Sequence, residues 1–315
     1  MIILVVLAIL LVAFWAANQR TRKTNTYKNF YRAIHVVKDV TSEEKYHIGA
    51  FGSTFSYYAY DLKPYSGHNF SIEPQSIAYM GKTIEHFIDN IDAGGFVLIS
   101  LAGCFFAATS TASDEECTTY YSFLRPVEFD RYDWKVKLKY LLKRYFPALL
   151  PFYLKSNWKD EPMKYAVNEG ISYDTGLVQA KRRLHGWEKV VAQPITEQFR
   201  ASEDLERKMR SNVERMKRIV AAVRSKDITP VFVVLPMSKA FNDVCPAAFY
   251  DQVLYRCLDL LKEEKVQTLD FLYDDELSEM KYYLMADCLN AKGRELFTQK
   301  VMEAITDRQE HTVIV

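Results

Sequence analysis

Two short stretches, far apart in the 315-residue sequence, carry side chains that could do chemistry. The first is the small-residue turn Gly52, Ser53 and Thr54, which follows an apolar run at 46–51. The second holds Asp287 and Cys288. A hydroxyl attacks an acyl group at neutral pH only when a base takes its proton, and a cysteine acts as a nucleophile or base only as a thiolate. The residue types therefore allow nucleophilic chemistry if the fold brings the two stretches together.

The apolar patterning predicts the sheet that must position these residues. Apolar runs predict strands at 46–51, 67–70, 96–101, 229–236 and 266–271. Three- and four-residue spacing predicts helices at 76–91, 203–226, 247–264 and 291–305. The connections are too long for hairpins, so we expect one α/β domain with a parallel, three-layer, flavodoxin-like sheet and helices on both faces. The turn at 52–54 then lies at the carboxyl edge, where such folds keep their sites.

Two further expectations concern the segments between these elements. Gly94 and Gly95 are expected to end the helix before strand 96–101, as glycine often does. Residues 285–293 are expected to form a loop that enters the last helix.

Residues 112–200 interrupt the alternation and predict a helical insertion. Residues 131–155 are basic and amphipathic and form its helical part. They either cap the core or form a lid or membrane-facing surface, because helices rich in aromatic and basic residues also lie in the membrane interface. Residues 156–200 show no clear period, so loops are expected around Trp158 and Trp187.

The amino terminus predicts a membrane anchor. Residues 1–18 form an apolar span, 19–45 a juxtamembrane linker with a helical piece at 27–40, 46–306 the α/β domain and 307–315 a tail. A cleaved signal peptide is the rival interpretation, but no basic segment precedes the span and no small-residue cleavage site follows it. The span is therefore expected to stay in the protein.

The composition limits the classes of partner and cofactor that we expect. A net charge of +1 gives no strong field toward nucleic acid. The five cysteines show no CxxC or metal-site spacing, so mostly buried thiols are expected. Metal clusters, phosphate-binding glycine loops and dinucleotide fingerprints are not recognisable, and we expect no cofactor.

The order of these segments resembles the SGNH/GDSL hydrolase superfamily, more narrowly its membrane-anchored branch in bacterial cell-surface polymer pathways. Residues 50–54 resemble its glycine-x-serine turn and residues 231–238 its late strand. Residues 285–297 are similar to its Asp-x-x-His-Leu-Asn-x-x-Gly pattern, with Leu289, Asn290 and Gly293 in place. The resemblance covers about 46–106 and 203–305. It implies an SGNH-type sheet, with oxyanion-binding or substrate-binding roles for Gly52, Gly67, His68 and Asn290.

The expected catalytic positions depart from the family pattern. The resemblance puts the nucleophile at Thr54, with Ser53 one residue earlier. The family's histidine falls on Cys288 and its aspartate on Met285, while Asp287 is out of register. Methionine cannot orient an imidazole, and loss of one member of such a set removes most of the rate.

Three hypotheses about activity stay open. The chain is a catalytically degenerate binding or scaffold subunit in surface-glycan modification. Alternatively, it is an active acyl esterase or O-acyltransferase, in which Ser53 or Thr54 attacks and Asp287, His68 or His185 is the base. In the third hypothesis, Cys288 is itself a nucleophile or acyl carrier.

Each candidate also has a purely structural interpretation. Ser53 and Thr54 would cap the following helix. His47 would pack on its strand and His68 would lie in a solvated turn. Cys288 would be a packing residue and Asp287 a cap for the helix near 290.

The location of the globular domain follows from two conflicting signals. Arg20, Arg22, Lys23 and Lys28 follow the span and none precedes it, which predicts a cytoplasmic domain. The resemblance implies an extracytoplasmic domain, with a surface glycan or a membrane acyltransferase as partner. An upstream basic extension would reconcile the two, and we expect the domain outside the cytoplasmic membrane.

Overall fold

The computed structural model describes residues 1–108, 117–152 and 163–312. The chain forms two compact units. We call residues 1–40 with 115–167 the N-terminal unit, and residues 41–114 with 168–315 the α/β unit. The segment predicted as one insertion, 112–200, is thus shared between the two units. Trp158 and the end of the predicted tail lie outside the described residues.

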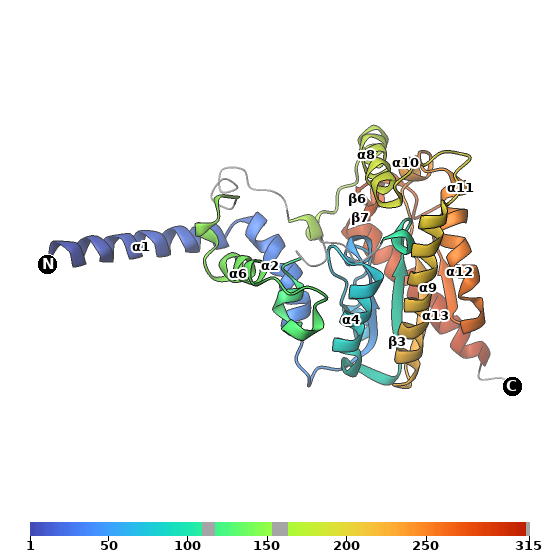
Figure 1. The fold of residues 1–315 in the computed structure, drawn as a ribbon, viewed down its shortest axis with the longest axis horizontal. Helices are drawn as coiled ribbons and strands as arrows, with labels where there is room; N and C mark the ends of the chain where they lie inside the picture. The colour runs from blue at the N-terminus through green and yellow to red at the C-terminus, as the bar shows by residue number, and fades with distance from the viewer. Residues whose placement is uncertain (109–116, 153–162, 313–315) are drawn as a thin grey trace. The chain divides into compact units, whose positions relative to one another are not determined.

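A five-stranded parallel sheet forms the centre of the α/β unit, as predicted (Figure 1). The spatial order is β2-β1-β3-β4-β5, the order of flavodoxin-like doubly wound sheets. Its strands are β1 Tyr46–Phe51, β2 Gly67–Asn69, β3 Ile91–Leu101, β4 Thr229–Val234 and β5 Gln267–Asp270. The central strands are buried on both faces, which explains their continuous apolar runs.

Helices cover both faces of this sheet. On one face, α9 packs against both α4 and α12, while α13 lies behind the sheet in Figure 1. Their bounds are α4 Ile77–Phe87, α9 Glu203–Arg224, α12 Arg256–Leu260 and α13 Ala291–Thr312. The helix predicted at 247–264 is divided into α11 (Ala247–Tyr250), a π-helical turn (Asp251–Tyr255), α12 and a final 3₁₀ turn. The α/β class and the flanking helices are confirmed.

The prediction that Gly94 and Gly95 end the helix expected at 76–91 is wrong. Helix α4 stops at Phe87, and β3 begins before the glycines. Asn90 fixes this boundary, because its side-chain amide donates hydrogen bonds to two main-chain carbonyls at 2.7 and 2.8 Å. Gly94 has a φ of +77°, which favours glycine, and a Cβ on Gly95 would lie 2.4 Å from the His47 carbonyl oxygen. The glycines therefore shape the start of β3.

Two segments expected to be loops are regular. Helix α8, Tyr173–Val191, occupies the region of Trp187, and its first turn is capped by Ser172, whose hydroxyl accepts from the Thr175 amide at 3.2 Å. Glycines within this helix obscured its apolar spacing in the sequence. Burial of Ala180, Trp187 and Val191 stabilises the helix. Residues 285–293 include a short antiparallel hairpin rather than a loop, formed by β6 Tyr283–Met285 and β7 Cys288–Leu289.

The N-terminal unit begins with α1, Ile2–Arg22, which is long and apolar enough to span a membrane. At about 1.5 Å per residue its length matches the roughly 30 Å hydrocarbon core of a bilayer. The apolar side chains along its first half are exposed, unlike those of a core helix. The unit continues with α2, Asn25–Lys38, which confirms the helix predicted at 27–40, and with α6, Trp134–Tyr145.

Candidate functional site

The carboxyl ends of β1 and β3 meet at the point where the strand order reverses. These strands are neighbours, yet β1 continues toward β2 on one side and β3 toward β4 on the other. Open α/β sheets bind ligands in the crevice at such a switch point. The turn at 52–54 follows β1 there, and residues 102–104 follow β3.

Only glycine fits at position 52, because neighbouring side chains lie too close to leave room for a Cβ. A Cβ at this position would lie 2.6 Å from the Ser56 Cβ and 2.9 Å from the Ser100 Cβ. Ser53 is the N-cap residue of the four-residue helix α3, Thr54–Tyr57, but its hydroxyl makes no capping hydrogen bond there. Ser53 and Thr54 are both half-buried. The prediction that the Ser53 side chain caps the following helix is therefore wrong.

A buried hydroxyl network fixes the base of the turn. The Ser56 hydroxyl is 2.6 Å from that of Ser71 and donates to that of Ser100 at 2.9 Å. The Tyr60 and Ser100 hydroxyls are 3.0 Å apart. Asn69 donates to the Ser56 carbonyl and accepts from the Ser71 amide, which ties the end of β2 to α3. These hydroxyls satisfy one another, so we assign the network to holding the turn in place.

Cys288 lies close to the turn, because β7 packs beside α3. The thiol is buried, and that burial, reinforced by the neighbouring Asp287 charge, raises the pKa of Cys288 well above its ordinary value. The side chain is therefore a neutral thiol at neutral pH. This environment supports a packing role and works against a thiolate nucleophile or base.

Asp287 forms an ion pair with Arg183 of α8. The Asp287 side chain is 3% exposed, whereas that of Arg183 is 40% exposed. Burial raises the pKa of Asp287, and the Arg183 guanidinium opposes that rise. The carboxylate is thus committed to a cation, which lowers its value as a general base for Ser53 or Thr54.

Helix α8 covers the switch point with large side chains. The ring of Trp187 packs on Gly103, where an added Cβ would lie 2.1 Å from a ring carbon. The same indole contacts Phe241 and Phe249, with ring centroids 4.9 and 5.6 Å away. The Arg183 guanidinium lies 5.7 Å from the Phe55 ring centroid, just after the turn. The region where an open α/β fold would bind a ligand is therefore largely occupied by α8.

The candidate histidines have other surroundings. His68 pairs with Gly49, three residues before Gly52, which places it about 10 Å back along the strand. Its ring contacts the rings of Tyr46 and Phe70. His47 lies still earlier on β1, against Phe96. Neither is positioned to take a proton at the turn.

His185 lies on α8 but not on the face that covers the sheet. It is two residues after Arg183, about 200° around the helix, and its ring bonds to Glu188 at the surface. Its location therefore does not supply a base for Ser53 or Thr54 either.

The two remaining predicted site residues have structural partners. The Gly67 amide donates to the Leu62 carbonyl at 3.0 Å, which uses the donor that an oxyanion would need. Asn290 accepts from the Gly293 amide at 2.9 Å and donates to the Lys281 carbonyl at 2.8 Å. It therefore fixes the start of α13.

Sequence reasoning missed Arg183 and Trp187. The cap at Ser172 and the apolar spacing of Ala180, Trp187 and Val191 were the available signals for α8. Pairing of Arg183 with Asp287 joins residues far apart in the chain, and no local pattern encodes it. Among the residues that the structure describes, no cluster of His, Cys, Asp and Glu is arranged to hold a metal.

Comparison with known proteins adds no family assignment: no family model matches the sequence, and no curated protein is significantly similar to it. The fold and the site define a parallel α/β protein with an N-terminal apolar helix.

Proposed function

We propose that this chain is a single-pass membrane protein related to the SGNH/GDSL hydrolases, and that its α/β unit acts as a non-catalytic subunit in bacterial cell-surface glycan modification. The observation that carries this proposal concerns the residue where the resemblance expects the catalytic histidine. Cys288 occupies that position as a buried thiol, beside the aspartate that forms an ion pair with Arg183. A hydroxyl at the turn lacks the base that acyl transfer requires.

The placement of α8 supports the same proposal. An esterase needs an open path for the acyl group to the nucleophile and to the oxyanion donors. Trp187 instead packs directly on the segment after β3. The alternative, an active esterase or O-acyltransferase using Ser53 or Thr54, draws on the absence of a capping bond at Ser53. It would require α8 to move aside and Arg183 to release Asp287.

Ester hydrolysis separates these alternatives. We expect the full chain in detergent to hydrolyse p-nitrophenyl acetate no faster than matched detergent buffer. Ser53→Ala, Thr54→Ala and Cys288→Ala should leave this background unchanged, because the site lacks an activated nucleophile. A rate above background that one of these substitutions abolishes would contradict the proposal and identify the nucleophile.

Complementation in the source bacterium tests the accessory role directly. Deletion of the gene is expected to lower the acylation of a surface glycan, measured by ester release from purified envelope. A Ser53→Ala, Thr54→Ala double variant should restore that acylation as well as the wild-type chain does. If the double variant fails although it reaches the membrane at wild-type level, the turn is catalytic and the proposal is wrong.

We also propose that α1 is a permanent anchor. Its last turn is integrated into the folded N-terminal unit: the Asn18 amide donates to the Tyr145 carbonyl at 2.9 Å, and its oxygen accepts from the Ala148 amide at 3.2 Å. Cleavage before this turn would sever the helix just ahead of a buried, hydrogen-bonded residue. Arg22, four residues later, adds a hydrogen bond to the Tyr145 carbonyl.

The anchor proposal predicts an intact, membrane-embedded protein. The mature chain should keep its first residues by intact-mass measurement and stay in the pellet after carbonate extraction. Protease added to whole cells should degrade the α/β unit if it lies outside the cytoplasmic membrane. A mature N-terminus after residue 17 would contradict the anchor, and protection in whole cells but not in lysates would contradict the outer location.

A further inference from the structure

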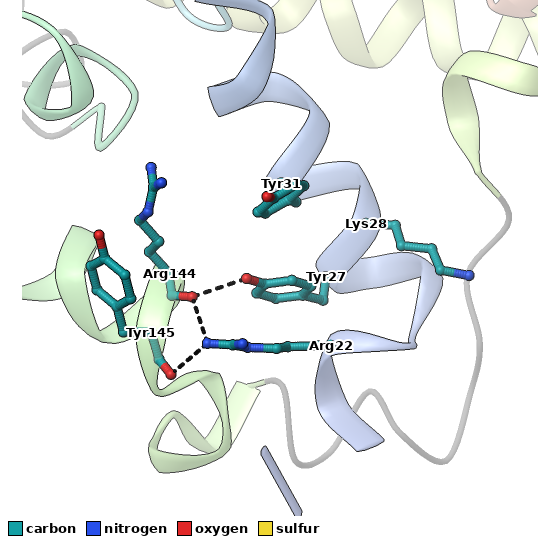
Figure 2. Close-up of a pocket in the computed structure, with 6 residues that line it drawn as sticks. All are labelled: Arg22, Tyr27, Lys28, Tyr31, Arg144 and Tyr145. Carbon is teal, nitrogen blue, oxygen red and sulfur yellow. Dashed lines mark hydrogen bonds between the residues drawn. The ribbon is translucent and has the colours of Figure 1, made fainter. Parts of the chain in front are cut away.

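The N-terminal unit contains a cavity of about 390 Å³ just beyond the apolar helix. Figure 2 shows the six residues that line it: Arg22, Tyr27, Lys28, Tyr31, Arg144 and Tyr145. They come from the end of α1, the first half of α2 and the end of α6. All of these elements belong to the N-terminal unit.

Arg22 is held in place by the end of α6. One of its terminal nitrogens donates to the Tyr145 carbonyl at 2.9 Å and lies 3.4 Å from that of Arg144. The Tyr27 hydroxyl donates to the same Arg144 carbonyl at 3.0 Å, and its ring lies alongside Arg22 in Figure 2. The Arg22 guanidinium is thus fixed at the wall of the cavity. Because no carboxylate lines the cavity among the described residues, an anion there would compensate the charge of this guanidinium.

The charge of the lining is one-sided. Arg22, Lys28 and Arg144 are cations, the other three residues are tyrosines, and no carboxylate belongs to the lining. Lys28 extends away from the other side chains in Figure 2 and adds its charge at the edge. Guanidinium groups suit a phosphate group.

Exposed apolar side chains follow the residues of α6 that line the cavity. Phe146, Leu149 and Phe152 are 47%, 55% and 65% exposed, and they follow the end of α6 directly. The Phe146 ring contacts that of Phe14 of α1, with centroids 6.2 Å apart. Apolar side chains thus continue from the apolar helix to Phe146, the residue that follows Tyr145 of the lining.

Helix α6 carries a second exposed apolar surface. Trp134, Leu138, Leu141 and Tyr145 recur at spacings of four, three and four residues, and all are exposed. Basic residues fill five of the other eight positions of this helix, a composition found in helices that lie in the membrane interface. The open interpretation of 131–155 as a membrane-facing surface therefore has structural support.

We propose that this cavity binds the phosphate of an anionic phospholipid headgroup. Arg22 supplies the fixed donor, Arg144 and Lys28 supply charge, and the acyl chains follow the exposed side chains of Phe146 and Leu149. A lipid accounts for both the cations and the apolar rim, whereas a free phosphate accounts for the cations alone. The inference does not depend on the function proposed for the α/β unit.

The test is direct binding by the full chain in uncharged detergent. A phosphatidylglycerol with a fluorescent acyl tail is titrated, and its anisotropy is recorded. We expect saturable binding that unlabelled phosphatidylglycerol displaces, while phosphatidylcholine displaces it at least about tenfold less well. Inorganic phosphate should compete only at far higher concentration than the lipid. Equal competition by inorganic phosphate or phosphatidylcholine would overturn the assignment.

Two matched pairs of variants locate the binding. Arg22→Gln is compared with Lys23→Gln, an exposed neighbour outside the lining, and Arg144→Gln with Lys139→Gln on the same helix. Arg144→Gln keeps the main-chain carbonyl that holds Arg22, so α6 stays docked. We expect each lining variant to weaken binding by about tenfold and each control by less than about twofold. Equal losses in lining and control variants would reduce the effect to general surface charge and overturn the proposal.

Discussion

Replacing Trp187 by alanine is expected to lower the free energy of unfolding of the α/β unit by about 3–5 kcal/mol, the largest effect that we predict for one substitution. The indole is 3% exposed and packs among Gly103, Phe241 and Phe249. Alanine would leave a cavity that these neighbours cannot close, because Gly103 belongs to the segment after a central strand. Helix α8 would lose its main attachment to the sheet.

Hydrogen exchange measured by mass spectrometry gives the local readout for this variant. In the full chain, amides of α8 should exchange much faster in Trp187→Ala than in the wild type, while those of β3 and β4 should change less. Trp134→Ala is the matched control, since Trp134 is 63% exposed and belongs to the N-terminal unit. Unchanged protection of α8 would show that Trp187 does not hold this helix over the switch point.

Arg183→Gln is expected to cost about 2–4 kcal/mol at neutral pH, because it leaves the Asp287 carboxylate buried without its cation. We place the value below that of a fully buried pair, since Arg183 is 40% exposed. Asp287→Asn in the same chain should recover most of the loss, because the amide carries no charge to desolvate. A double-mutant cycle from urea unfolding of the α/β unit measures this coupling.

The cost of Arg183→Gln should shrink as the pH falls. Burial raises the pKa of Asp287 in the folded state, and loss of Arg183 removes the effect that opposed this rise. The folded state then binds the proton more tightly than the unfolded chain, so stability falls as the pH rises from about 3.9 through the folded value. Unfolding at pH 5 and pH 7.5 checks the sign. A cost that is equal or larger at pH 5 would contradict the buried-carboxylate explanation.

These two side chains bear directly on the proposed loss of catalysis. Trp187 covers the segment after β3, and Arg183 occupies the only carboxylate that sequence reasoning offered as a base at the turn. If α8 were displaced in the Trp187→Ala variant, the turn at Ser53 would become more accessible. Ester hydrolysis should still stay at background, because Cys288 would remain a buried neutral thiol and because His68 and His185 lie away from the turn.

The repeating patterns of the sequence determined most of the fold. Strand β1 and helix α9 lie where their apolar spacing predicted, because a doubly covered strand and a one-sided helix leave unmistakable periods. The apolar helix at the amino terminus was equally plain. Burial of Cys288 and the parallel orientation of the strands also followed from local composition and connection lengths.

The tertiary structure alone decided how the candidate site is filled. The contact of Trp187 with Gly103 and the pairing of Arg183 with Asp287 each join segments that no local period connects. The lipid-binding cavity likewise depends on Arg22 meeting the end of α6. Periodicity reports which face of an element is buried, but not which other element covers it. Those choices are made by packing and by pairing of buried charges, and here they determine which side chains surround the turn at 52–54 and which line the cavity.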